Sequence, residues 1–108
     1  MKILDQAMLS VLMVGATHYV DLNRGADAVI YYESDKLAHM RLPGSETVSH
    51  GDMAMRPDGW FVKWRGGPEG NWHIQHTAPG RLEYLDGNKE RRGVVTRIVP
   101  GDAERIAA

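Results

Sequence analysis

Turn-forming segments recur at intervals of roughly eight to twelve residues along the chain after Gly15. They read NRGAD, ESDK, LPGSE, RPDG, RGGPEG, APG and LDGNKERRG. The stretches between them are short, repeat with a period of two, and are rich in Val, Ile, Tyr, Trp and Thr, which favour strands. No stretch is left for a crossover helix, so we expect consecutive strands to pair antiparallel.

This pattern predicts an all-β fold, an antiparallel meander of about eight strands. Such a meander can close into an up-and-down barrel, which removes its exposed edges and leaves an interior for side chains or one small ligand. The expected strands cover residues 16–22, 27–33, 36–42, 47–56, 60–65, 71–77, 81–85 and 93–99.

The N-terminal stretch has a helical period instead. Between residues 3 and 13 the apolar positions follow i, i+3, i+4, i+7 spacing, and Gly15 follows as an end signal. We predict one short helix over about 3–13, which plugs or flanks one end of the barrel. The length of 108 residues fits a single domain over residues 1–108.

Composition excludes several classes of function. The 13 basic and 14 acidic residues are mixed along the chain, so no basic stripe exists to attract nucleic acid. The absence of Cys excludes disulfides, thiolate nucleophiles and Cys-bound zinc. No apolar run has the length of an export core or a membrane span, so we expect no membrane association and a cytoplasmic protein, although a removed leader would leave no trace.

The strand 71–77 carries the first candidate site. Alternation places Trp72, Ile74 and His76 on the inward face and His73 in solvent. An inward imidazole among aromatic residues would favour its neutral form and could act as a general base or acid. The alternative is a half-buried histidine that bonds a backbone carbonyl or a Tyr hydroxyl.

A second candidate is the pair His50 and Asp52, which lie two residues apart and so share one face of a strand. A carboxylate beside an imidazole can fix its tautomer and raise its basicity. The alternative is a polar, solvent-facing stretch, because no nucleophile motif accompanies the pair. No metal-binding spacing occurs, so we predict no metal and no cofactor, with a site assembled across strands left open.

Other strands supply an aromatic set. Alternation predicts Leu82 and Tyr84 inward, and it predicts the row Val94, Thr96 and Ile98 inward. The aromatic side chains could line a pocket for a ligand or could fill a small barrel. They are Trp60, Trp64, Trp72, Tyr19, Tyr32 and Tyr84.

The order of several short motifs resembles a known family. LMVGATHYVDL, YYESDKLAHMR, GDMAMRPDGWFVKW, WHIQH, YLDGN and VVTRIVPGD follow one another from about Leu4 to Asp102. In this order they resemble small uncharacterised bacterial proteins with a lipocalin-like (calycin-like) β-barrel, grouped as a domain of unknown function. The resemblance implies a barrel and no particular activity. Members often carry a leader and paired Cys. This sequence has no Cys near its FVKW and WHIQH strands.

Two hypotheses of function follow. In the first, the barrel binds a small hydrophobic or aromatic molecule. If it is catalytic, it is a cofactor-free lyase, isomerase or cyclase with His76 or His50 as base and Tyr84 or Tyr32 at a developing oxyanion. In the second, the barrel is filled and the protein is an interaction or structural module. Outward Phe61, Tyr31, Met53 and Met55 would then form a homodimer or partner face. The two hypotheses differ in the volume of the interior.

Overall fold

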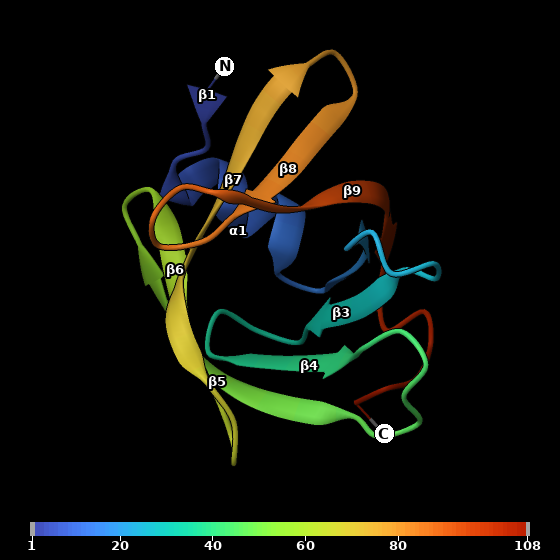
Figure 1. The fold of residues 1–108 in the computed structure, drawn as a ribbon. Helices are drawn as coiled ribbons and strands as arrows, with labels where there is room; N and C mark the ends of the chain where they lie inside the picture. Colours follow the sequence, from blue (N-terminus) through green and yellow to red (C-terminus); the bar gives the residue numbers. More distant parts are fainter. Residues whose placement is uncertain (1, 108) are drawn as a thin grey trace.

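The computed structural model describes residues 2–107, which form a closed antiparallel barrel of eight strands with one short helix (Figure 1). Each barrel strand pairs with its neighbours in sequence, and the last pairs back with the first. The predicted up-and-down barrel is therefore confirmed, and every expected strand has a counterpart. The barrel strands are β2 (Ala16–Asp21), β3 (Ala28–Tyr32), β4 (Leu37–Arg41), β5 (Ser49–Arg56), β6 (Gly59–Trp64), β7 (Glu69–Ala78), β8 (Arg81–Leu85) and β9 (Arg91–Pro100).

The helix α1 (Gln6–Met13) begins later than predicted, because Asp5 is its N-cap. The Asp5 carboxylate accepts a hydrogen bond from the backbone N–H of Met8 at 3.0 Å, which satisfies a free donor of the first turn. The residues before it form a short strand, β1 (Lys2–Ile3), which pairs with β7. No helix within residues 2–107 combines the length and the apolar character that crossing a membrane requires.

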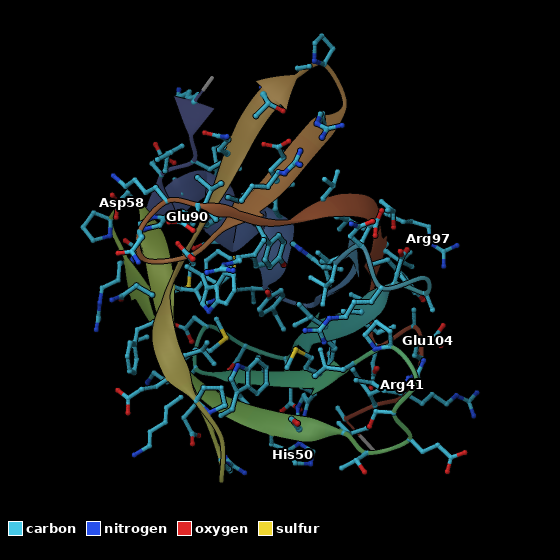
Figure 2. The ribbon with its side chains drawn as sticks, viewed as in Figure 1. Arg41, His50, Asp58, Glu90, Arg97 and Glu104 are labelled. Atoms are coloured by element: carbon cyan, nitrogen blue, oxygen red, sulfur yellow. The ribbon has the colours of Figure 1, made fainter. Side chains whose placement is uncertain are left out.

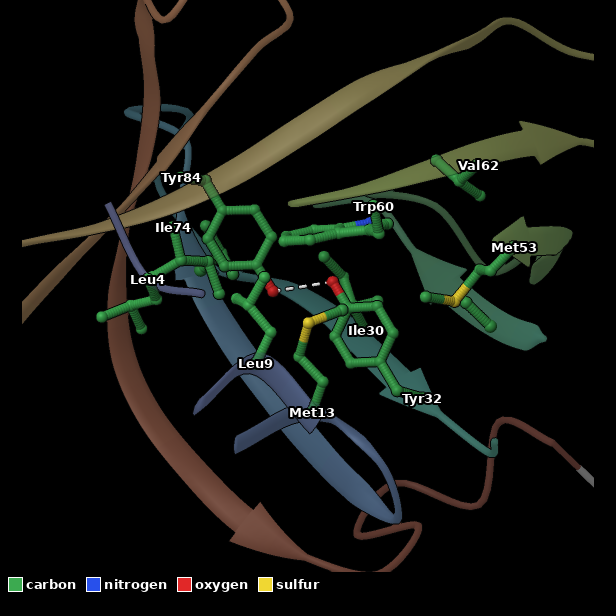
Figure 3. Packing of buried hydrophobic residues seen from close by; sticks show 12 residues of the cluster. Leu4, Leu9, Met13, Ile30, Tyr32, Met53, Trp60, Val62, Ile74 and Tyr84 are labelled. Carbon is green, nitrogen blue, oxygen red and sulfur yellow. Dashed lines mark hydrogen bonds between the residues drawn. The ribbon is translucent and has the colours of Figure 1, made fainter. Parts of the chain in front are cut away.

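The helix closes one end of the barrel, as predicted. The backbone N–H of Gln6 donates to the carbonyl of Pro57, in the turn between β5 and β6, at 2.9 Å. Leu9 and Met13 are fully buried and pack in the barrel core (Figure 3). Burial of two large side chains at this end removes it from solvent access.

Strand β2 is buried on both of its faces, because the C-terminal segment covers its outer side. The hydroxyl of Thr17 donates to the carbonyl of Gly101 at 2.6 Å, and the hydroxyl of Tyr19 donates to Glu104 at 2.8 Å. Ile106 packs beside Tyr19 in a small outer cluster. The usual alternation of apolar and polar residues is therefore absent from this strand.

A β-bulge shifts the register between β2 and β9. Tyr19 pairs with Arg97, whereas the next residue, Val20, pairs with Val95. Of the three residues that alternation predicts inward, Val94 and Thr96 thus lie on the outer side, which corrects that prediction. Thr96 donates to Asp27 at 2.6 Å, while Val95 packs against the core. One extra residue in a strand reverses the face on which every side chain beyond the bulge lies.

Candidate functional site

The barrel interior holds a cavity of about 470 Å³ that opens at the end opposite α1. Its mouth lies among the loops that follow β2, β4 and β6 and the start of β9, which bring Arg24, Leu42, Gly66 and Arg92 to the rim. The apolar part of the wall comes from alternate residues of β2, β3, β4 and β6 and from the residues just after β2 and β4. These residues are Val20, Leu22, Ala28, Ile30, Ala38, Met40, Leu42 and Val62.

Aromatic side chains form the rest of the wall. Trp60 meets Tyr32 edge-on, with ring centroids 6.0 Å apart, and meets Tyr84 in the same way at 5.6 Å. Trp64 and Trp72 complete this set. Edge-to-face contacts hold the rings in fixed orientations, so the aromatic wall is rigid as well as apolar.

A glycine makes room for one of these rings. A Cβ atom at Gly51 of β5 would lie 2.7 Å from the ring of Trp64 and 2.8 Å from Val62, both on the adjacent strand β6. No real Cβ contact is that short. The absence of a side chain at residue 51 therefore allows the Trp64 indole to lie across the inner face of the sheet.

A buried chain of hydrogen bonds lies at the closed end of the cavity, and Figure 3 shows its first bond, between the Tyr32 and Tyr84 hydroxyls. The Tyr32 and Tyr84 hydroxyls are 2.7 Å apart, the Tyr84 hydroxyl is 2.7 Å from His18 Nδ1, and His18 Nε2 is 2.8 Å from the carbonyl of Leu12. A carbonyl can only accept, so Nε2 carries the proton and Nδ1 accepts from Tyr84. The Tyr84 oxygen then accepts from Tyr32, and the direction of the whole chain is fixed.

Burial keeps this chain uncharged. Desolvation lowers the pKa of His18 to about 4, an effect that the hydrogen bond to the Leu12 carbonyl partly offsets. Desolvation also raises the pKa of Tyr32 and that of Tyr84. At neutral pH the imidazole and both phenols are neutral, and the lone pair of Nδ1 is already engaged by Tyr84. The chain therefore joins the cavity wall to α1 without offering a free base.

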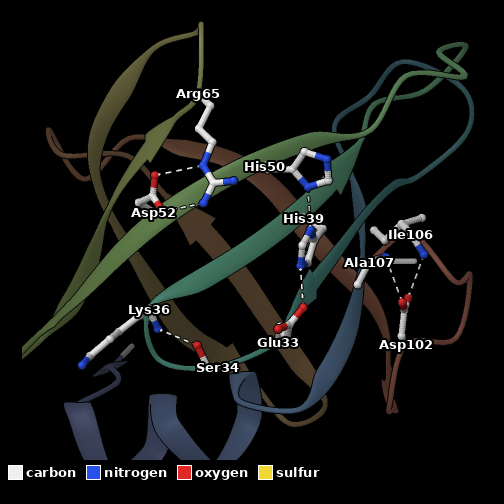
Figure 4. Close-up of polar contacts among 10 residues, drawn as sticks. All are labelled: Glu33, Ser34, Lys36, His39, His50, Asp52, Arg65, Asp102, Ile106 and Ala107. Atoms are coloured by element: carbon white, nitrogen blue, oxygen red, sulfur yellow. Dashed lines mark hydrogen bonds and ion pairs between the residues drawn. The ribbon is translucent and has the colours of Figure 1, made fainter.

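The charged residues of the lining within the described chain are Arg24, Arg65 and Arg92, all at the mouth. Asp52 accepts from Nε and Nη2 of Arg65 at 3.1 and 2.9 Å (Figure 4). Asp86 accepts from Nε of Arg92 at 2.7 Å. Two of the three guanidiniums are therefore paired with a carboxylate, that of Arg24 forms no ion pair within residues 2–107, and the depth of the cavity is neutral.

Five of the predicted site residues do come together around the cavity: Tyr32, Tyr84, Trp60, Trp64 and Trp72. Tyr19 does not, which corrects its prediction as a ligand-binding residue. Its ring lies on the outer side of β2, where the Arg97 guanidinium is 4.2 Å from the ring centroid. Arg97, Glu104 and Arg41 gather on that side of the molecule (Figure 2).

His76 also lies away from the cavity, and its prediction as an inward residue is wrong. It is exposed and pairs with Lys2 and Leu82, where β7 continues beyond the ring of strands beside β1. His73, expected in solvent, is buried instead, with Nδ1 2.7 Å from the carbonyl of Asp58. The turn between β5 and β6 covers the outer face at His73, whereas His76 is exposed on the part of β7 that pairs with β1.

His50 and Asp52 share one face of β5, as predicted, but that face is the outer one and they do not interact with each other, which corrects their prediction as catalytic residues in the cavity. The Nδ1 atoms of His50 and His39 are 2.7 Å apart, and His39 Nε2 is 2.9 Å from Glu33 (Figure 4). Asp52 pairs with Arg65 instead. Neither residue faces the cavity, and residues 2–107 contain no group of three His, Asp or Glu side chains placed to hold a metal ion.

Sequence reasoning missed His18 and the mouth arginines. His18 lies in ATHYVD, where both faces are buried and no alternation marks an inward residue. Arg24 and Arg65 lie in or beside turns, where charged residues are common for reasons of solubility alone. The order of strands in a meander could have indicated the two arginines, because the loops that follow β2 and β6 must lie at the same end of the barrel.

Comparisons with protein-family models, with curated proteins and with solved structures find no match to this chain.

Proposed function

We propose that this barrel binds one small hydrophobic or aromatic molecule in its interior cavity. The cavity itself is the observation that carries the proposal: about 470 Å³ of space with apolar and aromatic walls, open at one end. Sites for small molecules are typically concave, mostly apolar and about 300–1,000 Å³ in size. An eight-stranded barrel is of a size that can hold one small ligand.

The walls suggest how such a molecule would be held. A planar ligand could lie against Trp60 and Trp72, whose rings are fixed by contacts with Tyr84 at 5.6 and 6.4 Å. Rigid walls lose little conformational freedom when a ligand enters, which favours affinity. The resemblance to lipocalin-like barrels agrees with this mode of binding and stays a prediction.

The proposal is limited to binding. The residues expected as bases, His76 and His50, lie outside the cavity, and the buried histidine beside it, His18, has a pKa of about 4 with both nitrogens engaged. A useful general base would need a free lone pair and a pKa near the working pH. Among the described residues that line the cavity none offers such a base, so the proposal does not include the lyase, isomerase or cyclase activity.

The filled-barrel alternative is the weaker one. A barrel packed solid would leave no cavity of this size. Its expected outer face is also reduced, because Met53 is buried in the core and Met55 packs against the core, which corrects their prediction as outward residues. Phe61 and Tyr31 are half-buried on the outer side, and a homodimer stays a prediction.

Titration with the neutral fluorescent probe N-phenyl-1-naphthylamine tests the proposal. We expect saturable binding by the folded protein, with energy transfer from the cavity tryptophans. Met40→Trp adds bulk inside the cavity and should weaken binding by at least tenfold. Ala54→Trp adds the same bulk on the outer face of β5 and should leave binding unchanged. Absence of saturable binding, or equal binding by the two variants, would contradict the proposal.

A further inference from the structure

We propose that the ligand is an anionic amphiphile, a molecule with an apolar body and a carboxylate head, whose head is bound by the arginines at the mouth. This inference rests on the proposed function, because it names the chemical class that the same cavity accepts. It depends on a separate observation, the distribution of charge between the mouth and the depth of the cavity.

The charge of the lining has one sign. Arg24, Arg65 and Arg92 contribute to the described lining, which contains no Asp or Glu. They come from three separate parts of the chain: the loop after β2, the loop after β6 and the start of β9. The meander brings these segments to one end of the barrel, where Arg24 and Arg92 lie at the opening and Arg65 turns to Asp52 on the outer face of β5.

Two of these guanidiniums, those of Arg24 and Arg92, keep donors for an incoming anion. Among the ion pairs of residues 2–107, Arg24 takes part in none. Asp52 holds Nε and Nη2 of Arg65 on the outer face of β5, so the head-group site is assigned to Arg24 and Arg92. Arg92 uses Nε on Asp86 and approaches Glu90 only at 3.9 Å. A carboxylate matches the planar, forked geometry of these donors.

The depth of the cavity excludes the charged head. The closed end presents Trp60, Ile30 and the rings of Tyr32 and Tyr84, and the Tyr hydroxyls already hydrogen bond to each other. A carboxylate placed there would lose its hydration without gaining a cationic partner, which is costly. The apolar body should therefore occupy the depth and the head should stay at the mouth.

A matched set of ten-carbon ligands tests the inference: decanoate, decanol and decylamine, each measured by displacement of N-phenyl-1-naphthylamine. We expect decanoate to bind about tenfold more tightly than decanol, decylamine to bind more weakly than both, and the advantage of decanoate to shrink at high salt. Arg24→Gln should remove most of that advantage and leave decanol binding unchanged. Arg56→Gln, outside the lining, is the matched control.

The two proposals fail in different ways. If decanol displaces the probe as well as decanoate does, or Arg24→Gln affects neither, the head-group inference is wrong and the apolar binding site stands. If decylamine binds most tightly, the inference is also overturned. If neither the probe nor any of the three ligands binds to the folded protein, the proposed function itself fails. Arg24 is exposed in a loop, so its replacement should not disturb folding, which a melting curve verifies.

Discussion

Three side chains connect the cavity wall to the N-terminal helix: Tyr32, Tyr84 and His18. Their hydrogen bonds run in one direction, from the Tyr32 hydroxyl to the Leu12 carbonyl near the end of α1. Tyr84 is the central member, because it donates to one partner and accepts from the other. A buried network in which every group is satisfied makes the removal of its centre more costly than the removal of its end.

Replacement of Tyr84 by Phe should therefore destabilise the protein more than replacement of Tyr32 by Phe. Tyr84→Phe leaves the buried Nδ1 of His18 without a donor, for which we expect a loss of about 1–3 kcal/mol in the free energy of unfolding. Tyr32→Phe leaves the bond to His18 intact and should cost about 0.5–1.5 kcal/mol. Urea denaturation measures both. A larger loss for Tyr32→Phe would mean that the chain does not run as described.

His18 also predicts how stability depends on pH. Its pKa falls from 6.5 to about 4 on folding, so below pH 6.5 the unfolded chain takes up a proton that the folded chain does not. The free energy of unfolding contains the full contribution of His18 above pH 6.5. The free energy of unfolding should decrease by about 3 kcal/mol as the pH falls to 4.

Urea denaturation at a series of pH values checks this expectation, with His18→Gln as the matched variant. The variant should lose less stability than the wild type between pH 6.5 and pH 4, because it has no imidazole to protonate. Parallel losses in the two proteins would show that the His18 ring is not buried in its neutral form.

At the scale of strands, the position of Trp64 depends on the neighbouring strand β5. A Cβ at Gly51 would meet the Trp64 ring at 2.7 Å, whereas a Cβ at Gly70 of β7 would meet nothing within 4 Å. The glycine of β5 is thus required for the shape of the cavity wall, and the glycine of β7 is not.

Gly51→Ala should therefore displace the Trp64 indole and cost about 1–3 kcal/mol in stability, as overpacked cores do. Gly70→Ala is the matched control, on the other strand that pairs with β6, and should be close to neutral. Tryptophan fluorescence and thermal melting report the two effects. An unchanged emission spectrum in Gly51→Ala would contradict the placement of Trp64.

Strand patterns predicted the inner face well where a strand is covered on one side only. Trp60, Val62 and Trp64 alternate along β6 and all pack in or against the core, as a period of two requires. The same rule failed for His76, because β7 continues past the barrel, and failed for Thr96, because of the bulge beside Val20. It could not find His18, because the C-terminal segment buries the outer face of β2. Long-range covering of a strand leaves no trace in its local period.

At the scale of the whole molecule, the barrel has two different ends. The helix closes one end with Leu9 and Met13, and the loops of the other end carry arginines around an opening. This polarity could be predicted only in part from the sequence, which indicated a barrel and a plugging helix. The volume left inside depends on how the side chains pack against one another, and alternation gives only the direction in which each one points.

The central claim is that the open interior of this barrel is the binding site. Two-dimensional NMR of the ¹⁵N-labelled protein tests it most directly, because the indole N–H groups of Trp60, Trp64 and Trp72 each give a separate signal and all three residues line the cavity. We expect titration with N-phenyl-1-naphthylamine to shift these indole signals progressively and to leave the backbone amides of His39 and His50, on the outer face, unshifted. Shifts confined to the outer face, with the three indole signals unmoved, would contradict the claim.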